Sequence, residues 1–362
     1  MREDTKPPPT TMIGLDLGSR RSHVCVLERA EGRVLERFEV PTTPDGLRAR
    51  FLGRARGLIV LEASGPSPWV SRLLRGLGHD VHVANTRQLA LIAESQRKTD
   101  RHDAEMLARL GRSELDLLGR SVMHRDEVQQ IDLELLKARD ALVRVRTALI
   151  NHVRGALKSL GHAVPGGAAE AFARRTRPVV PPALAATLEP LLQQIETLTA
   201  TIRTYDRRVE AVAEERYPVT KLLREVNGVG PVTSLAFALV IHDPWRFRSS
   251  RSVGPYVGLA PASFQSGETD PQLRITKAGN AFLRRLLVGS AQYMLGPFGQ
   301  DSALRRHGLA LTQRGGKNAK RRAVVAVARK LAVLLHRLWV TGEAYEALRG
   351  ARAHPEPAPT AS

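Results

Sequence analysis

The chain has 362 residues, enough for two or three domains, and 43% of them are hydrophobic, enough for real cores. Its formal net charge of +19 predicts a polyanionic partner, with nucleic acid as the first candidate, and its single cysteine excludes an internal disulfide and a cysteine-based zinc site. Because no stretch reaches 18 uncharged apolar residues and the N-terminus has no apolar signal region, we expect a soluble, cytoplasmic protein without membrane contact.

The positive charge is unevenly distributed along the chain. Residues 218–342 hold 19 Lys and Arg against 5 Asp and Glu, whereas residues 1–115 hold 19 against 15. A genome rich in G and C would explain the preference for Arg over Lys, but not this segregation. We therefore expect most of the affinity for polyanions to lie in the C-terminal third.

The N-terminal part reads as an α/β domain over 12–120, after a flexible arm at 1–11. Apolar segments bounded by turn residues predict five strands, of which the first three form an antiparallel meander, at 12–18, 22–29, 33–40, 57–63 and 80–85. Apolar residues at helical spacing predict helices at 44–52, 68–78, 86–95 and 100–111. This order is that of the ribonuclease-H-like, or RuvC-like, fold, an analogy in which the first and fourth strands lie side by side.

The remainder of the chain reads as helical. Two long amphipathic helices, joined by a segment rich in Pro and Gly at 161–182, predict an antiparallel coiled-coil hairpin over 121–216 and an oligomerisation surface. A mainly α-helical domain follows at 217–342. It starts with a helix–Gly-Val-Gly–helix segment that is either a phosphate-facing helix-hairpin-helix or an ordinary packing unit. Residues 343–362 are predicted to be a disordered tail.

Four acidic residues stand out in the N-terminal domain. Asp16 lies within an apolar strand, where a carboxylate is costly to bury unless it is paired or metal-bound, and Glu62 ends the apolar fourth strand. Asp100 and Asp103 lie about one helical turn apart and can point at one spot. Four converging carboxylates would suit Mg²⁺, and two metal ions would suit phosphodiester chemistry.

Each of these carboxylates also has a plainer interpretation. Asp100 and Asp103 are the residues expected of a helix N-cap and its third position, and Asp16 could pair with Arg20 or Arg21. The metal hypothesis is favoured by the conjunction of all four in the chain order that the fold requires. Capping and metal binding are also compatible, because a capping carboxylate keeps spare lone pairs.

Several segments together resemble a known family. "IGLDLG", "LEASG" and "KTDRHDAEMLA" in the N-terminal part, and "GVGPVTSLAFALVIHDPWRFRSSRSVGPYVGLAPASFQSG" and "RITKAGNAFLRRLL" in the C-terminal part, resemble the DEDD-motif transposases of the IS110 insertion-sequence family. The resemblance covers roughly residues 12–340 in one order. Separate motifs at both ends agree, which makes it specific.

The resemblance implies a mechanism and partners. Asp16, Glu62, Asp100 and Asp103 match a Mg²⁺-binding tetrad in a Holliday-junction-resolvase-like domain, and Ser266 matches an essential serine. A structured non-coding guide RNA, of the bridge-RNA type, would pair with donor and target DNA. The two halves of the active site would come from different subunits of a homo-oligomer, a dimer or a tetramer. This chain departs from the family pattern at Thr276, where Ser is frequent, and in its long break at 161–182.

The basic residues and Ser266 carry the nucleic-acid hypothesis. On spacing alone, the Ser-Gly at 266 is usually a turn, and the basic run at 314–322 is either a solvated face or a set of phosphate contacts. Nearby Arg274 and Lys277 could help to activate a serine nucleophile and stabilise a phosphorane. The residues predicted to contact nucleic acid are Lys98, Arg274, Lys277, Arg284, Arg314, Lys317, Lys320 and Arg321.

The sequence thus predicts an RNA-guided DNA transposase or recombinase. Ser266 would attack a DNA phosphate, form a phosphoserine link and free a 3′-hydroxyl, with Mg²⁺ assisting the phosphoryl transfer. One alternative is a structure-selective nuclease that uses the tetrad with water as its nucleophile. A second alternative is a non-catalytic nucleic-acid-binding protein.

Overall fold

The computed structural model describes residues 8–85, 100–113, 115–119, 121–164, 166–262, 273–316 and 318–349, and of residues 100, 116 and 117 it describes the backbone only. The chain divides into two compact units, Met1–Gln130 and Ile131–Ser362. None of the helices in these described segments is long and apolar enough to cross a membrane.

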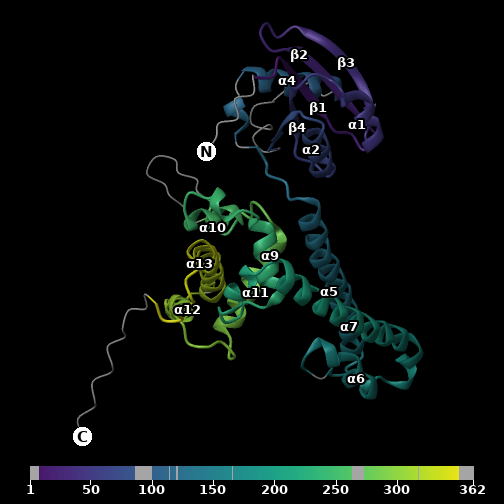
Figure 1. Ribbon diagram of the computed structural model, residues 1–362. Coiled ribbons are helices and arrows are strands. Elements are labelled where there is room, and N and C mark those ends of the chain that lie inside the picture. The colour runs from purple at the N-terminus through teal and green to yellow at the C-terminus, as the bar shows by residue number, and fades with distance from the viewer. Residues whose placement is uncertain are drawn as a thin grey trace, which may run out of the picture. The chain divides into compact units, whose positions relative to one another are not determined.

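The first unit is built on a five-stranded mixed sheet (Figure 1). Its strands are β1 (Thr11–Asp16), β2 (Arg21–Glu28), β3 (Val34–Pro41), β4 (Gly57–Glu62) and β5 (Asp80–Ala84). The sheet order is β3-β2-β1-β4-β5, in which β2 pairs antiparallel with β1 and β3, whereas β4 pairs parallel with β1 and β5. The five predicted strands, the meander and the central pairing of the first and fourth strands are confirmed.

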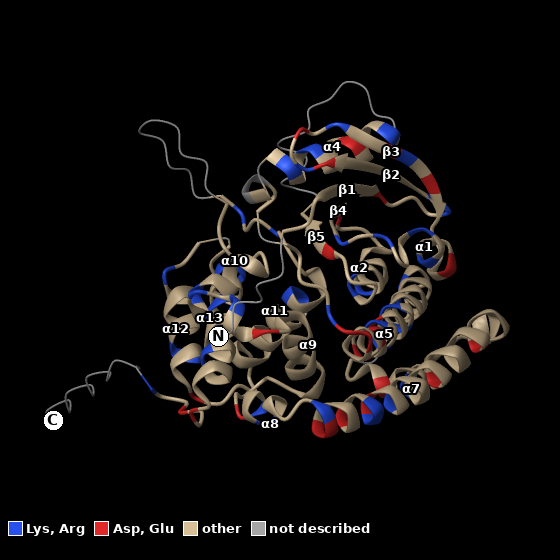
Figure 2. Ribbon diagram, turned by 45° about the horizontal axis from the view of Figure 1, so that its top comes forward, with Lys and Arg blue, Asp and Glu red and all other residues tan. Residues whose placement is uncertain are grey.

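Helices cover both faces of this sheet, as Figure 2 shows. The short helices α1 (Pro44–Phe51) and α2 (Ser67–Gly76) pack on one face, where Ile13 and Leu15 meet Phe51 and Leu74 in one buried cluster. Helix α4 (Asp100–Ser113) packs on the opposite face, against alternate residues of the same strands, and the short turn η1 (Leu115–Leu118) follows it. The helix predicted at 86–95 lies outside the described residues.

Gly14 allows α4 to lie directly against β1. A Cβ atom added at Gly14 would stand 1.8 Å from the carbonyl oxygen of Ala104 and 2.6 Å from the amide nitrogen of Ala108. Both of those atoms belong to the helix backbone, which cannot move aside as the end of a flexible side chain can. The separation between this helix and the sheet therefore depends on the absence of a side chain at position 14.

We expect Gly14→Ala to destabilise the first unit by about 3 kcal/mol or more, because overpacking against a backbone forces the helix and the sheet apart. The matched control is Gly76→Ala, since Gly76 ends α2 and an added Cβ would meet nothing within 4 Å. The control is expected to be neutral or to stabilise by a few tenths up to about 1 kcal/mol. Urea unfolding followed by circular dichroism measures both, and equal stabilities would contradict the close packing.

The second unit begins with a long helical hairpin. Helices α5 (Glu127–Ser159) and α7 (Pro182–Arg216) are joined through η2 (Ala169–Ala171), α6 (Phe172–Thr176) and η3 (Arg177–Val179), so the predicted break contains a short helix that the sequence did not indicate. The helices run antiparallel, because the side-chain contacts pair rising numbers on α5 with falling numbers on α7: Asp132 with Arg216, Arg139 with Asp206, and Arg146 with Thr199. Coiled-coil geometry remains a prediction.

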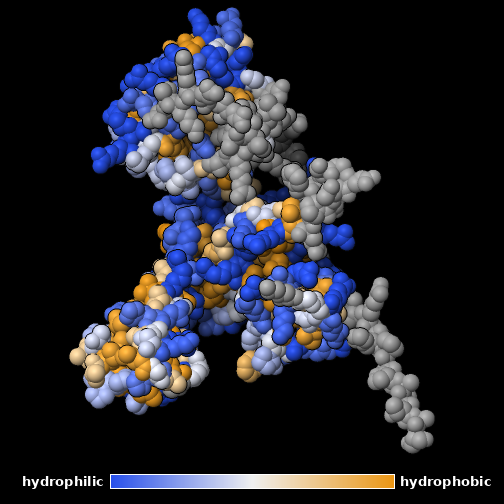
Figure 3. Space-filling view, turned by 180° about the vertical axis from the view of Figure 1, so that it is seen from behind, coloured by the Kyte–Doolittle hydropathy of each residue, from blue (hydrophilic) through white to orange (hydrophobic). Residues whose placement is uncertain are grey.

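The far end of this hairpin has a mixed surface. Figure 3 shows apolar and polar residues side by side over the part of the hairpin that contains α6. Leu160 is 57% exposed and Val179 is 37% exposed, whereas Phe172 of α6 is fully buried. The exposed apolar residues are those expected of a contact surface, which the sequence also predicted for this hairpin.

A helical bundle completes the second unit, which is mostly α-helical as predicted. Its elements are α8 (Val219–Arg224), α9 (Pro231–Ile241), η4 (Pro244–Arg246), η5 (Ser250–Ser252), α10 (Val253–Tyr256), α11 (Ala281–Leu295), α12 (Ala303–Gln313) and α13 (Ala319–Thr341). Helix α9 lies in the core, and Gly228 in the turn before it packs against Tyr293 and Met294 of α11. That contact favours the packing-unit interpretation of the Gly-Val-Gly turn.

The C-terminal tail does not start where the sequence suggested. Residues 343–349, predicted as part of a disordered segment, pack onto the bundle. The amide of Tyr345 donates a hydrogen bond to the Glu225 carboxylate at 3.0 Å, and the amide of Ala303 donates to the carbonyl of Ala347 at 2.7 Å. The rest of the predicted tail lies outside the described residues.

Candidate functional site

Asp16 and Glu62 end two neighbouring parallel strands. The last paired residues of β1 and β4 are Leu15 and Leu61, and each carboxylate residue follows its leucine directly. Side chains alternate along a strand, so Asp16 lies on the same face as Gly14, and Glu62 on the same face as Val60. Both carboxylates, each half-buried, therefore belong to the sheet face that α4 covers.

The direction of α4 brings its first turn toward Asp16. Ala104 lies over Gly14, whereas Gly111, two turns later, lies over Val60 and Met12. The helix therefore runs opposite to β1, and its N-terminal end faces the end of β1 that carries Asp16. Helix α4 begins at Asp100, and half-buried Asp103 follows in the same turn.

The donor set suits a hard cation. Asp16, Glu62 and Asp103 supply carboxylate oxygens at the same end of the same sheet face, which is the chemistry that Mg²⁺ prefers. Among the side chains that the structure describes, no group of three or more His, Cys, Asp and Glu is close enough to hold a metal. The Asp100 side chain, the fourth predicted ligand, lies outside that description.

Ion pairs fix α4 against the edge of the sheet. Glu105 accepts hydrogen bonds from Arg37 of β3 at 2.7 Å and from Arg109 at 2.7 Å, and these two bonds lower the pKa of its carboxyl. Arg101, in the first turn, lies 3.6 Å from the Glu39 carboxylate. These contacts hold the helix in the register that directs its first turn toward β1.

A hydrogen-bond clamp shapes the loop that follows Glu62. The buried Ser67 hydroxyl donates to the Ser64 carbonyl at 2.8 Å, accepts from the Ser64 amide at 3.0 Å, and lies 2.9 Å from His124 Nε2. Burial, together with the charges of Arg75, Arg72 and Arg125, lowers the pKa of His124 to about 4. The imidazole is therefore neutral near pH 7 and holds the loop without adding charge beside the carboxylates. No sequence pattern indicated this clamp, since its two ends lie far apart along the chain.

The predicted nucleophile, Ser266, lies outside the described residues, but the segments on either side of it are paired. The amide of Ala262 donates to the carbonyl of Arg274 at 2.9 Å, and the amide of Thr276 donates to the carbonyl of Ala260 at 2.9 Å. Residues 263–272 therefore start and end at one point of the second unit. Arg284, predicted to contact nucleic acid, instead donates to the carbonyls of Val257 and Ala278 at 2.9 and 3.0 Å, which steadies this pairing.

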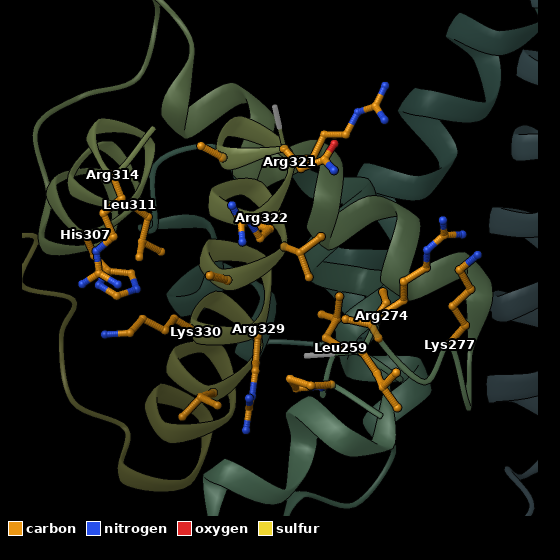
Figure 4. Close-up of a pocket in the computed structure, with 18 of the residues that line it drawn as sticks. Leu259, Arg274, Lys277, His307, Leu311, Arg314, Arg321, Arg322, Arg329 and Lys330 are labelled. Atoms are coloured by element: carbon orange, nitrogen blue, oxygen red, sulfur yellow. The ribbon is translucent and has the colours of Figure 1, made fainter. Parts of the chain in front are cut away.

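A basic pocket of about 1490 Å³ lies beside these paired segments (Figure 4). Four of its cations were predicted as nucleic-acid contacts: Arg274, Lys277, Arg314 and Arg321. Arg322 belongs to the basic run at 314–322, a candidate for phosphate contacts, whereas Arg251, Arg329 and Lys330 were not predicted. Arg329 and Lys330 follow Arg322 on α13 by seven and eight residues, and this spacing is the signal that could have placed them on the same helix face. Lys320 lies on the exposed surface of α13 outside the pocket lining, and Lys98 and Lys317 lie outside the described residues.

Known proteins resemble both parts of the chain. A transposase profile of the DEDD type from IS110 elements matches residues 13–162, and the profile described as transposase IS116/IS110/IS902 family matches residues 220–299. The chain is 31% identical over 291 residues to a probable family 20 transposase of Pseudomonas aeruginosa, covering 77% of this chain and 82% of the relative. It is 29% identical over 299 residues to the transposase for insertion sequence element IS1111A of Coxiella burnetii, covering 80% and 79%.

A third relative is the transposase for insertion sequence element IS1328 of Yersinia enterocolitica, at 29% identity over 295 residues, covering 79% of this chain and 84% of the relative. Both parts of the chain thus match the same family in the same order, over most of the length of each relative. The chain belongs to the IS110 family of transposases, enzymes that cut and rejoin DNA.

Proposed function

We propose that this transposase is an RNA-guided DNA recombinase, with Ser266 as its nucleophile and Asp16, Glu62, Asp100 and Asp103 as its Mg²⁺ ligands. The observation that carries the proposal is the placement of Asp16, Glu62 and the first turn of α4 at one end of one sheet face. Carboxylates that converge from these positions would repel one another unless a cation neutralised them.

The four carboxylates have a common task in this proposal. Bound among them, Mg²⁺ supplies charge neutralisation at a phosphate oxygen and at the leaving oxygen of a phosphodiester. The sheet holds Asp16 and Glu62 on rigid strand ends, and α4 holds Asp100 and Asp103 through its contact at Gly14 and its ion pairs. Rigid placement matters because an ill-placed ligand set loses both metal affinity and rate.

The serine chemistry conserves the energy of the phosphodiester. The Ser266 hydroxyl loses its proton to a base while its oxygen bonds to a DNA phosphorus atom. The bond from phosphorus to the 3′-oxygen breaks, and that oxygen takes up a proton. A phosphoserine link and a free 3′-hydroxyl result. A second 3′-hydroxyl would then lose its proton and attack the phosphorus of this link, and the bond from phosphorus to the serine oxygen would break as that oxygen takes up a proton, which rejoins DNA and restores Ser266. Arg274 and Lys277, next to the segment that contains Ser266, supply positive charge for the pentacoordinate phosphorus.

The proposed partners are donor DNA, target DNA and a structured guide RNA. The net charge of +19 and the basic pocket of the second unit support polyanion binding. In Figure 2, Lys and Arg gather on α13, whereas α7 carries both signs. We further propose a homo-oligomer, a dimer or a tetramer, for which the exposed apolar residues at the end of the hairpin would supply contact area.

RNA guidance makes a direct prediction about what purifies with the protein. Protein produced in cells together with the non-coding ends of its element is expected to retain a defined RNA and to recombine donor and target plasmids. Protein produced without those ends is expected to be equally stable but to recombine neither the donor nor the target plasmid. Sequencing of the retained RNA and a plasmid recombination assay check both points. Full recombination by protein treated with ribonuclease and freed of RNA would contradict guidance by RNA.

A further inference from the structure

The basic pocket of the second unit is a groove lined by three parts of the chain. Helix α13 crosses its centre, with His307, Leu311 and Arg314 of the α12 region on one side and the paired segments 259–261 and 273–277 on the other (Figure 4). At about 1490 Å³ it exceeds the roughly 300–1,000 Å³ of an ordinary small-molecule pocket. Its size therefore suits several linked units of a polymer better than one metabolite.

The groove is strongly basic. Among the residues that the structure describes, its lining contains eight Lys and Arg and no Asp or Glu. Seven of the eight, all except Arg322, form no salt bridge with any carboxylate in the described part of the chain. By contrast, Arg306 on the same α12 is held by the Asp301 carboxylate at 2.6 Å. Burial and the charges of Lys330 and Arg314 lower the pKa of His307, as expected where positive potential accumulates.

The walls between these cations are apolar. Leu259, Leu273 and Ile275 line one side, Leu311 the other, and Val325 and Val333 project from α13. The cations on α13 lie on its exposed surface, so the charges lie at the rim and the apolar side chains below them. Phosphates are attracted to such a rim, whereas nucleobases gain from contact with apolar walls.

We propose that this groove binds an unpaired polynucleotide strand, with its phosphates on the rim cations and its bases against the apolar walls. A duplex keeps the faces of its bases stacked inside and exposes its phosphates, sugars and base edges, so it could use the rim but could not lay its bases against the walls. The inference rests on the proposed function, because strand exchange leaves unpaired nucleotides at the cut. Pro261 and Leu273 line the groove on either side of residues 263–272, so the bound strand would pass the points at which the chain leads into and out of the segment that contains Ser266.

The test compares binding of single strands and duplex by fluorescence anisotropy, with the full-length protein. The probes are labelled oligo(dT), oligo(U) and a mixed-sequence DNA duplex, each about 12 nucleotides long, within the range of known single-strand site sizes. The first variant, Arg329→Gln with Lys330→Gln, removes two exposed rim charges. We expect its affinity for the single strands to fall at least about tenfold. Its slope of log affinity against log salt should decrease by about 1.4.

A second variant isolates the apolar walls. Leu273 is 39% exposed, so Leu273→Ser should leave the fold intact. It is expected to weaken binding of the single strands several-fold, because the bases lose apolar contact with the leucine side chain, without changing the salt slope or duplex affinity. The control is Lys221→Gln with Arg248→Gln, two exposed cations of the same unit outside the groove. This control should lower the affinity for all three probes slightly and to the same extent.

The outcomes separate this inference from the function on which it rests. No loss of single-strand affinity beyond the control in the first variant, or equal losses of single-strand and duplex affinity in Leu273→Ser, would overturn the inference. The two single-stranded probes distinguish a DNA strand from an RNA strand as the preferred occupant. A wild-type protein that shows the expected binding pattern but never recombines DNA would refute the proposed function and leave the groove assignment standing.

Discussion

Ser266→Ala is expected to form no covalent link to DNA and to recombine nothing, while it still binds DNA and RNA. The hydroxyl oxygen is the only nucleophilic atom of the serine side chain, and the methyl group of alanine cannot bond to phosphorus in its place. Loss of a catalytic nucleophile commonly reduces the rate by at least about four orders of magnitude. Binding should persist because the substitution leaves the groove cations and the buried side chains of the helical core unchanged. A protease-sensitive adduct on a DNA end, seen in denaturing gels of the wild-type protein, is the expected signature.

Mass spectrometry of the trapped wild-type adduct gives the decisive reading, a nucleotide attached to the peptide that contains Ser266. Ser249→Ala is the control, since Ser249 is an exposed serine of the same unit and should form the adduct at the wild-type level. Free 5′-phosphates without an adduct, together with full cleavage by Ser266→Ala, would assign the cut to water. The chain would then act as a nuclease that uses the carboxylates alone.

Much of the first unit could be predicted because its signals are local. Each strand is a short apolar run between turn residues, and the alternation along β1 places Asp16 on one face whatever the rest of the chain does. The pairing of β1 with β4 followed only from analogy with a known fold. Once that pairing is granted, Asp16 and Glu62 fall at neighbouring strand ends without further information.

The contacts that hold this site together could not be predicted, because they depend on distance in space. Gly14 reads in the sequence as a weak point of a strand, and only the packed structure shows that its missing side chain admits α4. The same holds for the clamp between Ser67 and His124, whose 57-residue separation leaves no local pattern. The basic groove is another such case, since its cations come from segments between Arg251 and Lys330 and only part of them form a run.

Asp16→Asn and Asp103→Asn are each expected to abolish recombination and to weaken the response of the protein to Mg²⁺. Asparagine keeps the shape of the side chain but removes one negative charge from the ligand set. Since loss of an outer-shell partner of a metal already costs about 10–100-fold, loss of a ligand should cost more than about 100-fold in recombination. The fold should persist, because both residues are only half-buried and lie beside the Gly14 contact, not within it.

Thermal unfolding in the absence of DNA separates metal binding from chemistry. A cation that binds only the folded wild type should stabilise it by about 2.7 kcal/mol when its concentration is 100 times the dissociation constant, and chelation should reverse the gain. Each variant should need more Mg²⁺ for the same gain. Asp45→Asn is the matched control, because Asp45 also lies in the first turn of a helix but is 97% exposed on α1, which covers the opposite face of the sheet. If Asp103→Asn responds to Mg²⁺ and recombines as Asp45→Asn does, then the first turn of α4 serves only to cap the helix, and the metal ligands lie elsewhere.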